Sequence, residues 1–230
     1  MSPLSPLLAL SRKVVTMNNL PDLKCAILGA SGHGKVIAEI AELNGFPEIH
    51  FYDDRWPKLL QVENWPVSGN SDTLFKKISN YANIVVAIGN NATRLEKYHR
   101  LFSLGAYCLP LVHPTAAVSH YACLGLGTVV MAGAVINPFS HIGRACIINT
   151  AATVDHDCLI ADGVHISPGA HLAGGVEVAE ASWLGIGCQI KQQVKIGSNV
   201  IVAAGATVIH DVLANQKVAG VPAKSICRKE

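Results

Sequence analysis

The sequence contains few charged and few aromatic side chains: 15% of its 230 residues are charged and 6% are aromatic, whereas 50% are hydrophobic. A chain this apolar is expected to fold around a buried core and not to be disordered. Positive charge is also scarce, because the formal net charge is +2 and no run of Lys and Arg occurs. This balance argues against nucleic acid as the main partner, while acidic small molecules stay open.

Long hydrophobic runs and paired cysteines are missing too. No segment approaches the roughly 18 apolar residues of a spanning helix, so we expect no membrane span. The seven cysteines are an odd number without a C-x-x-C pair, which predicts reduced thiols in a cytoplasmic protein. The apolar run Leu7–Leu10 lacks a basic leader and a cleavage site, so residues 1–23 are predicted to be an extension, with Met17 as an alternative start.

Residues 24–109 alternate between strand and helix patterns. Apolar runs and turn residues predict strands at 25–30, 49–54, 83–89 and 107–109, and helices at 33–45, 72–81 and 91–104. Strands separated by helices are typical of a parallel sheet. We therefore expect an N-terminal α/β Rossmann-like domain over residues 24–109.

From Val112 onward the sequence repeats with a period of six residues. The first position of each hexapeptide from Val112 to Val208 is Val, Ile or Leu, seventeen times without a break. Such a period indicates a parallel β-helix of hexapeptide repeats over residues 110–230, with the branched side chain inside and a small one at position five, where the wall turns. Cys146, Cys158 and Cys188 all stand at position five, and we expect them to pack in the wall.

Several motifs resemble those of a known family. They are GASGHG (Gly29–Gly34), FYDD (Phe51–Asp54), AIGNN (Ala87–Asn91), HPTA (His113–Ala116), INTAATVDHDC (Ile148–Cys158), HISPGAHLAG (His165–Gly174) and GVPAK (Gly220–Lys224). The repeat is similar to that of the left-handed β-helix acyltransferases. The layout from Cys25 to Ile226 resembles the UDP-N-acetylbacillosamine N-acetyltransferases, which act on UDP-4-amino-4,6-dideoxy sugars, and also the sialic acid O-acetyltransferases.

The resemblance implies a left-handed β-helix and an enzyme of bacterial glycan biosynthesis. Acetyl-CoA would be the cosubstrate, no metal would be needed, and a UDP-linked amino sugar would be the acceptor. The resemblance also implies a homotrimer with active sites between subunits. O-acetylation of a hydroxyl, for instance that of sialic acid, remains an alternative.

The glycine loop Gly29–Lys35 fits two phosphate-binding patterns incompletely. The P-loop pattern requires Ser or Thr at the position of Val36, and three or four strands make only about half of a dinucleotide fold. Backbone N–H groups at a helix N-terminus nevertheless accept phosphate, although the glycines could also serve packing alone. Asn91 fits as the N-cap of the following helix. The resemblance implies nucleotide-sugar contacts from Ser31, Gly32, His33, Asp53, Asp54, Gly89 and Asn90.

The triplet Asp155-His156-Asp157 interrupts the apolar repeat. It occupies positions two to four of its hexapeptide, which point outward or form the corner. Acetyl transfer from a thioester to an amine needs a group that takes the amine proton, and a histidine beside a carboxylate suits that task. The resemblance implies His156 as the general base and Asp157 as the residue that raises its basicity. The family often has Glu at the second place, which is one methylene longer than Asp.

The same resemblance implies further contacts around the reacting groups. His165, Gly174, Ile186 and Ala204 would contact acetyl-CoA, and Asn149 would position the amine or a water. Because 18-residue coils lie about 4.8 Å apart, Gly174 should stack on His156 and leave room for the thioester. Zinc chemistry of the carbonic anhydrase type is disfavoured, since no two histidines between residues 113 and 210 lie five apart.

Overall fold

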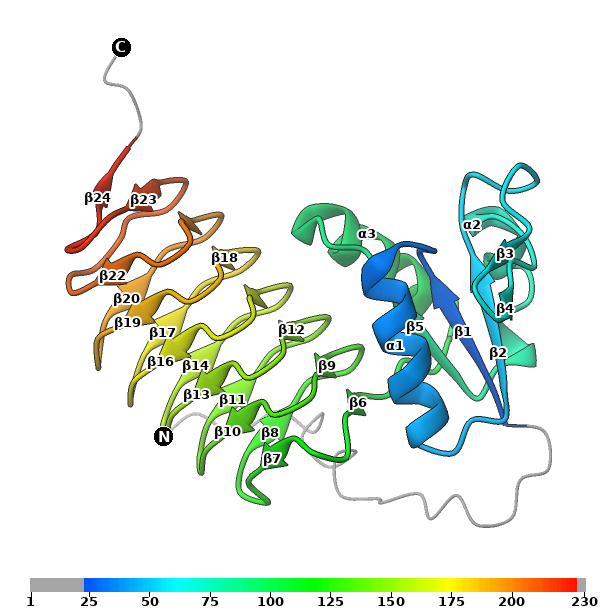
Figure 1. Ribbon diagram of the computed structural model, residues 1–230, viewed down its shortest axis with the longest axis horizontal. Helices are drawn as coiled ribbons and strands as arrows, with labels where there is room; N and C mark the ends of the chain where they lie inside the picture. The colour runs from blue at the N-terminus through cyan, green and yellow to red at the C-terminus, as the bar shows by residue number, and fades with distance from the viewer. Residues whose placement is uncertain (1–22, 227–230) are drawn as a thin grey trace.

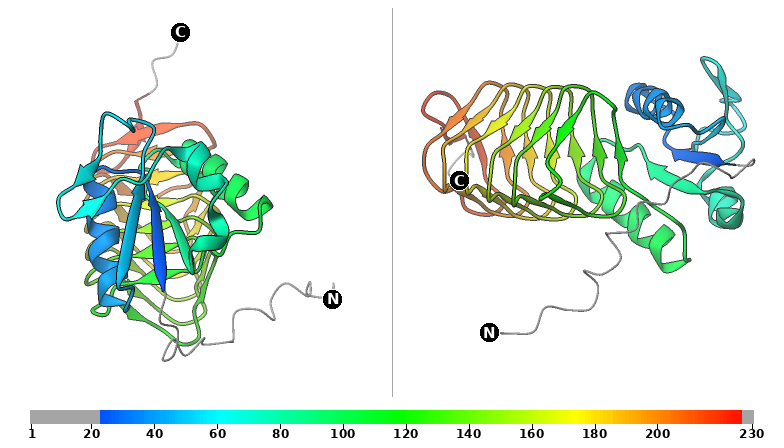
Figure 2. Two further views of the ribbon diagram at one scale, coloured as in Figure 1. Left: turned by 90° about the vertical axis from the view of Figure 1, so that its right-hand side faces the viewer. Right: turned by 90° about the horizontal axis from the view of Figure 1, so that it is seen from below.

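The structure is a computed structural model that describes residues 23–226. The predicted extension, apart from Leu23, and the alternative start at Met17 lie outside the described residues. An α/β domain, which we call the front domain, stands against the N-terminal end of a long β-helix (Figure 1). Two further views show the coils stacked as a regular prism (Figure 2). No helix within residues 23–226 is both long enough and apolar enough to cross a membrane.

The front domain is built on a parallel three-stranded sheet of order β2-β1-β5. Its elements are β1 (Lys24–Leu28), α1 (Gly32–Leu43), β2 (Glu48–Tyr52), β3 (Gln61–Val62), β4 (Trp65–Pro66), α2 (Ser71–Phe75), the 3₁₀ helix Ile78–Asn80, β5 (Asn83–Val86) and α3 (Asn91–Ser103). β2 and β5 flank β1 on opposite sides, so the chain reverses direction across the sheet at β1. In such sheets ligands bind in the crevice outside the carboxyl ends of the strands.

The predicted strand at 107–109 is wrong. Tyr107 O accepts one hydrogen bond from Ile84 N, at 2.8 Å. Next to it, the Asn83 side chain binds both backbone groups of Leu109, accepting from its N at 2.8 Å and donating to its O at 3.3 Å. A side-chain amide therefore replaces the next rung of the ladder, and the segment runs beside β5 as irregular chain. The predicted helix at 72–81 is also divided, into α2 and the 3₁₀ helix.

The β-helix consists of very short strands, and those from β6 to β22 each cover positions six and one of a hexapeptide. The strands are β6 (Leu111–Val112), β7 (Ala117–Val118), β8 (Cys123–Leu124), β9 (Val129–Val130), β10 (Val135–Ile136), β11 (His141–Ile142), β12 (Ile147–Ile148), β13 (Thr153–Val154), β14 (Leu159–Ile160), β15 (His165–Ile166), β16 (His171–Leu172), β17 (Glu177–Val178), β18 (Trp183–Leu184), β19 (Gln189–Ile190), β20 (Lys195–Ile196), β21 (Ile201–Val202), β22 (Thr207–Val208), β23 (Lys217–Ala219) and β24 (Lys224–Ser225).

These strands form the three faces of the left-handed β-helix. The first face has the order β6-β9-β12-β15-β18-β21-β23-β24, the second β7-β10-β13-β16-β19-β22, and the third β8-β11-β14-β17-β20. Up to β22, neighbouring strands of a face are offset by 18 residues, as Ile148 and Ile166 are. We call the turns between faces the first corner (first to second face), the second corner (second to third) and the third corner (third to first).

The interior of the β-helix is filled as the repeat predicts. The first-position residues from Val130 to Val208 are buried, and the three before them are partly buried. From Gly127 to Gly205 the residue at position four of every hexapeptide has a positive φ. Seven of these residues are glycine, and the others are Phe139, Ala145, Ala151, Asp157, Ala181, Gln193 and Asn199. The left-handed conformation turns the chain at each corner.

The wall cysteines are confirmed as packing residues. Cys146, Cys158 and Cys188 are at most 1% exposed, and burial raises the pKa of Cys146 and of Cys188 to about 12. The Sγ of Cys146 and of Cys158 donates to a carbonyl 15 residues further on, at 3.1 and 3.3 Å. The hydroxyls of Thr128 and Ser182, also at position five, make the same bond at 2.7 Å. Small polar side chains thus brace one coil against the next.

The repeat shortens at its C-terminal end. By strict period Val212 is a position-five residue, yet it pairs with Ile196, a position-one residue 16 places earlier. Val218 likewise pairs with Val202 across 16 residues. The corner after Val208 is therefore two residues shorter, and the apolar Val212 takes an interior place.

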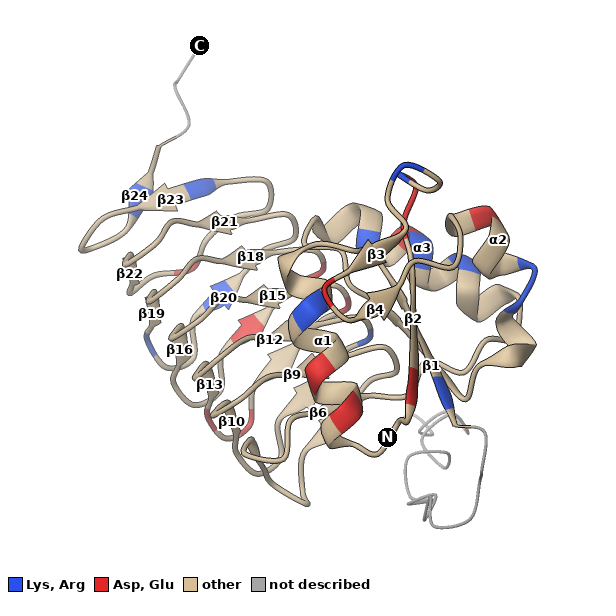
Figure 3. Cartoon of the chain, turned by 45° about the vertical axis from the view of Figure 1, so that its right-hand side comes forward, with Lys and Arg blue, Asp and Glu red and all other residues tan. Residues whose placement is uncertain are grey.

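The front domain packs on the first face and on the third corner. Leu111, Val129 and Ile147 of the first face share a buried cluster with residues of α1 such as Ile37. At the third corner, a Cβ on Gly127 would come within 2.8 Å of the Tyr98 ring on α3. Figure 3 shows that charged residues are denser on the front domain than along the coils. The second corner, which carries His156, is the corner away from the front domain.

Candidate active site

The Asp-His-Asp triplet forms the second corner of its coil, between β13 and β14. Asp157 has φ 60°, and this conformation turns its carboxylate back towards the neighbouring ring. The His156 Nδ1–H donates to Asp157 Oδ2 at 2.7 Å. The shorter aspartate therefore reaches the ring. Because Nδ1 is engaged, Nε2 of the exposed ring is the nitrogen left to accept a proton.

The surroundings of His156 raise its pKa. The hydrogen bond that His156 donates to Asp157 is the main cause of the raised pKa, and the negative charge of Asp155 adds to it. Asp155 is itself held in place, because its Oδ1 accepts from His156 N at 2.8 Å and from Asn137 Nδ2 at 2.8 Å. The corner thus presents an exposed imidazole whose basicity and orientation are set by two fixed carboxylates.

Gly174 stacks on His156 in the next coil, as its 18-residue offset predicts. A Cβ at Gly174 would lie 2.6 Å from both Cε1 and Nε2 of His156. The imidazole itself occupies the space that the glycine leaves. Gly174 thus makes room for the ring, and its contact with acetyl-CoA stays a prediction.

The residues predicted to contact acetyl-CoA do not lie together on one chain. Ile186, 58% exposed, and Ala204, also exposed, stand one coil apart at the first corner. His165 lies on the first face, whereas His156 and Gly174 lie at the second corner. Within one chain, the second face of the β-helix thus separates His156 and Gly174 from His165, Ile186 and Ala204.

His165 is buried at the junction with the front domain, with 9% of its surface exposed. Its ring stacks on Trp183 at 5.4 Å. Asn149 Nδ2 donates to its Nε2 at 3.1 Å, and its Nδ1 is buried without a hydrogen-bond partner among the described residues. Burial, followed by the charges of Arg94 and His33, lowers the pKa of His165 to about 3, so the ring is neutral.

Three loops of the front domain meet at the carboxyl edge of its sheet. Ala30 N donates to Asp53 Oδ2 at 2.8 Å, which joins the loops after β1 and β2. A Cβ at Gly29 would lie 2.7 Å from Ala87 O, which joins the loops after β1 and β5. Gly29 is thus required for packing. In contrast, a Cβ at Gly32 or at Gly89 would meet no atom within 4 Å, so both glycines border open space.

Asp53 and Asp54 hold these loops in place. Both oxygens of Asp53 receive hydrogen bonds from Arg55, whose side chain is mainly responsible for lowering the pKa of Asp53 to about 2. Asp54 Oδ1 accepts from Ser71 N at 2.9 Å, at the start of α2. Nucleoside contacts from these two carboxylates stay predictions.

The N-cap of α3 falls on the first of two adjacent asparagines and not on the second. The nucleotide contact expected of Asn90 stays a prediction. Asn90 is the N-cap, because its Oδ1 accepts from Thr93 N at 3.0 Å. Asn91 was predicted to be the cap, but it is buried and its Nδ2 donates to the β-helix carbonyls of Ala181 and Ser182, at 2.9 and 3.1 Å. Spacing cannot separate adjacent asparagines, since each can cap a helix that starts one residue later.

Arg94 is a buried residue that the sequence motifs did not single out. It is 1% exposed and donates hydrogen bonds to both regions of the molecule. The available signal is its place on α3, where the buried residues Asn91, Arg94, Leu95, Tyr98 and Leu101 follow helical spacing. An arginine in an apolar stripe indicates a buried interaction and not a solvated face.

No group of three His, Cys, Asp or Glu side chains within residues 23–226 could hold a metal ion. The described cysteines are free thiols.

Comparisons with known proteins cover both regions. Residues 24–101 match the family model of the PglD N-terminal domain, and residues 175–210 match the bacterial transferase hexapeptide model. The UDP-N-acetylbacillosamine N-acetyltransferase of Bacillus subtilis is 37% identical over 109 residues, which are 46% of this chain and 50% of the relative. The match therefore spans about half the length of that curated relative.

Solved structures match along nearly the whole chain. The acetyltransferase domain of PglB from Neisseria gonorrhoeae is 43% identical with a TM-score of 0.85, over 88% of this chain and 99% of that one. The same domain has been solved with acetyl coenzyme A. A variant of perosamine N-acetyltransferase from Caulobacter crescentus, in complex with CoA and GDP-perosamine, is 35% identical with a TM-score of 0.84, over 90% and 97% of the two chains.

Proposed function

Since this chain belongs to the family of hexapeptide-repeat sugar N-acetyltransferases with a PglD-type front domain, we propose that it acetylates a nucleotide-linked amino sugar. The donor is acetyl-CoA, and the acceptor is the 4-amine of a UDP-4-amino-4,6-dideoxy sugar used in bacterial glycan biosynthesis. The observation that carries the proposal is the exposed His156–Asp157 pair, joined at 2.7 Å and backed by Gly174. The solved relatives, one in complex with acetyl coenzyme A and one with CoA and GDP-perosamine, support an acetyl-CoA donor and a nucleotide-linked amino sugar as acceptor.

His156 is the proposed general base. As the amine nitrogen attacks the thioester carbonyl, His156 Nε2 takes the proton that the nitrogen loses. Asp157 holds the Nδ1–H and stabilises the imidazolium. When the C–S bond breaks, the same proton can pass to the departing thiolate. A cysteine nucleophile is not required, and burial raises the pKa of Cys146 far above neutrality.

The phosphates of the acceptor are proposed to bind at the carboxyl edge of the β2-β1-β5 sheet. Two features support this place: the N-terminus of the 12-residue helix α1, whose N–H groups and dipole favour anions, and the open space beside Gly32 and Gly89. Ser31, His33 and Asn90 border the same loops. The pyrophosphate would lie between the loops after β1 and β5, where the sheet reverses direction.

A second subunit is needed to complete the proposed site. The front-domain loops lie at the first face and third corner, whereas His156 lies at the second corner of the same chain. We propose the homotrimer that the resemblance implies, with His156 of one subunit serving the front-domain loops of its neighbour. The acetyl-CoA contacts of His165, Ile186 and Ala204 would likewise meet His156 across a subunit boundary. The cytoplasm, where acetyl-CoA is made and thiols stay reduced, is the proposed location.

The test is coenzyme A release with competing acceptors. UDP-4-amino-4,6-dideoxy-N-acetylglucosamine, a GDP-linked 4-amino sugar and free sialic acid are offered together with acetyl-CoA. Thiol release with the UDP-linked amine supports the proposal. Release with the GDP-linked sugar alone changes the nucleotide, and release with sialic acid alone replaces N-acetylation by O-acetylation.

The shared site is tested by mixing two inactive variants. His156→Ala lacks the base, and Gly32→Leu fills the open space at α1, where an added Cβ would meet no protein atom within 4 Å. If sites lie between subunits, random exchange restores roughly a quarter of the activity. A mixture that stays inactive after verified exchange would place both elements in one subunit.

A further inference from the structure

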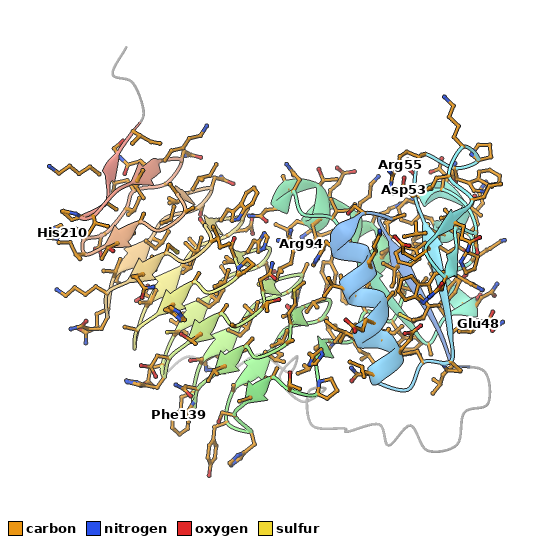
Figure 4. The ribbon with its side chains drawn as sticks, viewed as in Figure 1. Glu48, Asp53, Arg55, Arg94, Phe139 and His210 are labelled. Atoms are coloured by element: carbon orange, nitrogen blue, oxygen red, sulfur yellow. The ribbon has the colours of Figure 1, made fainter. Side chains whose placement is uncertain are left out.

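Arg94 is the largest fully buried side chain of the described residues, and it lies between the front domain and the β-helix (Figure 4). Within residues 23–226 no carboxylate forms an ion pair with it. Burial lowers its pKa to about 10, so the guanidinium is still charged at neutral pH. A buried charge without a counter-charge is costly, and its hydrogen bonds show what it does there.

On one side the guanidinium binds two successive coils. Nε donates to Ala145 O at 2.8 Å, and Nη2 donates to Gly163 O at 2.7 Å. These two acceptors are 18 residues apart at position four of the third corner. Arg94 therefore bridges two neighbouring coils through their backbone carbonyls.

On the other side it binds the loop after β5. Nη1 donates to Ile88 O at 3.0 Å and to Gly89 O at 3.1 Å, and Nη2 donates to Asn91 Oδ1 at 2.8 Å. With these bonds all five N–H groups of the guanidinium have acceptors. Gly89 is one of the two glycines that border open space at the proposed phosphate site.

Asn91 extends the same contact by one coil. Its Nδ2 donates to Ala181 O at 2.9 Å, the next carbonyl in the column of Ala145 and Gly163. Arg94 and Asn91 together therefore fasten the start of α3 to three successive coils.

We propose that Arg94 is a positioning residue for the nucleotide-sugar site: it fixes the loop Ala87–Asn90 to the coils of the β-helix and supplies a fixed positive charge beside Gly89, at the proposed diphosphate site. The inference rests on the proposed function, because it deepens the same site. Arg94 does not touch the substrate; it acts through the backbone of Gly89 and through its electric field.

The effect of the Arg94 charge on nearby histidines supports the part of the proposal that concerns a fixed positive charge. The positive charge of Arg94 contributes, after burial, to lowering the pKa of His33 to about 4 and that of His165 to about 3. One histidine belongs to the front domain and the other to the β-helix, so the field acts on both sides of the junction. Both rings stay neutral, and the charge that remains between them favours an anionic group.

Lysine cannot replace this arrangement. Its single ammonium nitrogen has three donors at one point, whereas the planar guanidinium reaches acceptors on two opposite sides at once. Arg94→Lys keeps the charge but gives up either the loop or the coils. Arg94→Met removes the charge as well.

The experiment compares these variants with Arg144→Met in the full chain. The Arg144 guanidinium lies 5.8 Å from the Phe102 ring of α3, at the same junction, and is a matched control. Titration calorimetry with UDP and with GDP gives the dissociation constant, and steady-state assays give kcat and the two KM values. We expect Arg94→Lys to raise the nucleotide dissociation constant and the nucleotide-sugar KM about tenfold, and Arg94→Met more. The KM for acetyl-CoA should stay within about twofold, as should every constant of Arg144→Met.

The outcomes separate the two proposals. If wild type binds the nucleotide but releases no coenzyme A, the proposed function fails, and the dissociation constants still test Arg94. Unchanged affinities with a lower kcat would show that Arg94 only maintains the folded fraction. Wild type that binds neither nucleotide overturns the inference. Should Arg94→Met not fold, the comparison uses Arg94→Lys and Asn91→Ala instead. Asn91→Ala loses the hydrogen bond to Ala181 O on the third coil.

Discussion

The β-helix and the front domain place their candidate functional residues in different ways. In the β-helix the hexapeptide assigns each position to the interior, a corner or the outside, so three ionisable side chains in a row at one corner are easily noticed. Asp155, His156 and Asp157 form such a run, and Gly174 makes room for the His156 ring. In the front domain no period exists, and the candidate site arises where three loops meet at one sheet edge. In a repeat, a candidate site can be recognised in the sequence because its residues differ from those of the other repeats. In a mixed α/β domain, it can be recognised only from the geometry of the folded loops.

The largest expected effect comes from removing the proposed base, His156. His156→Ala should lower kcat by about 10²–10⁴-fold, because the amine proton loses its acceptor. Coenzyme A release measures the rate. His141→Ala, which removes an exposed histidine on β11 of the third face, should keep wild-type activity. Equal rates for both variants would remove His156 from the mechanism.

Gly174→Ala tests whether the His156 ring needs the space that Gly174 leaves. The added Cβ would overlap Cε1 and Nε2 of His156, so the ring must swing aside. We expect kcat to fall about 10²-fold, the usual consequence of a misplaced catalytic group, with the melting temperature nearly unchanged. Gln192→Ala, one coil further in the same column, is the control. A fully active Gly174→Ala would show that the ring does not need this position.

Asp157→Asn tests how the neighbour tunes the base. Asp157 raises the pKa of His156, and the base works only when neutral, above that pKa. Loss of the carboxylate lowers the pKa, so the acidic limb of the kcat/KM profile should move to lower pH, while the plateau falls about tenfold. Asparagine tolerates the positive φ of this position. Asp157→Glu should restore the limb, and an unmoved limb would contradict the assignment.

The smallest effect concerns the wall and leaves the site untouched. Ser182 Oγ donates to Gly197 O at 2.7 Å and accepts from Val200 N at 3.0 Å. Ser182→Ala should lower the free energy of unfolding by about 1–3 kcal/mol, because both partners lose a buried hydrogen bond. Denaturant titration measures it. Ser182→Cys should lose less, since a thiol makes the same bond at Cys146.

The fold was predictable from the sequence to a large extent because periodic patterns report burial directly. Seventeen branched residues at a spacing of six define the coils, and apolar runs define β1, β2 and β5. The errors lie where a single side chain replaced a regular contact. Asn83 takes the place of a strand pairing at 107–109, and Val212 moves inward where a corner is two residues shorter.

The candidate site divides in the same way. His156, Asp157 and Gly174 could be placed together from spacing alone, because all three lie within two successive coils. The bonds of Arg94 to the coils, those of Asn91, and the buried state of His165 could not, since the partners that decide them lie between 16 and 91 residues away.

The coils, the order of the two regions and the corner that carries the proposed base can all be read from the amino-acid sequence, because they follow from local period and 18-residue stacking. The side of the prism that the front domain covers cannot, and neither can the resulting separation of its loops from His156 of the same chain. The buried arginine that joins the two regions is likewise visible only in the folded molecule. Such contacts depend on how the buried faces of α1 and α3 meet the first face and the third corner, and no periodicity along the chain encodes that meeting.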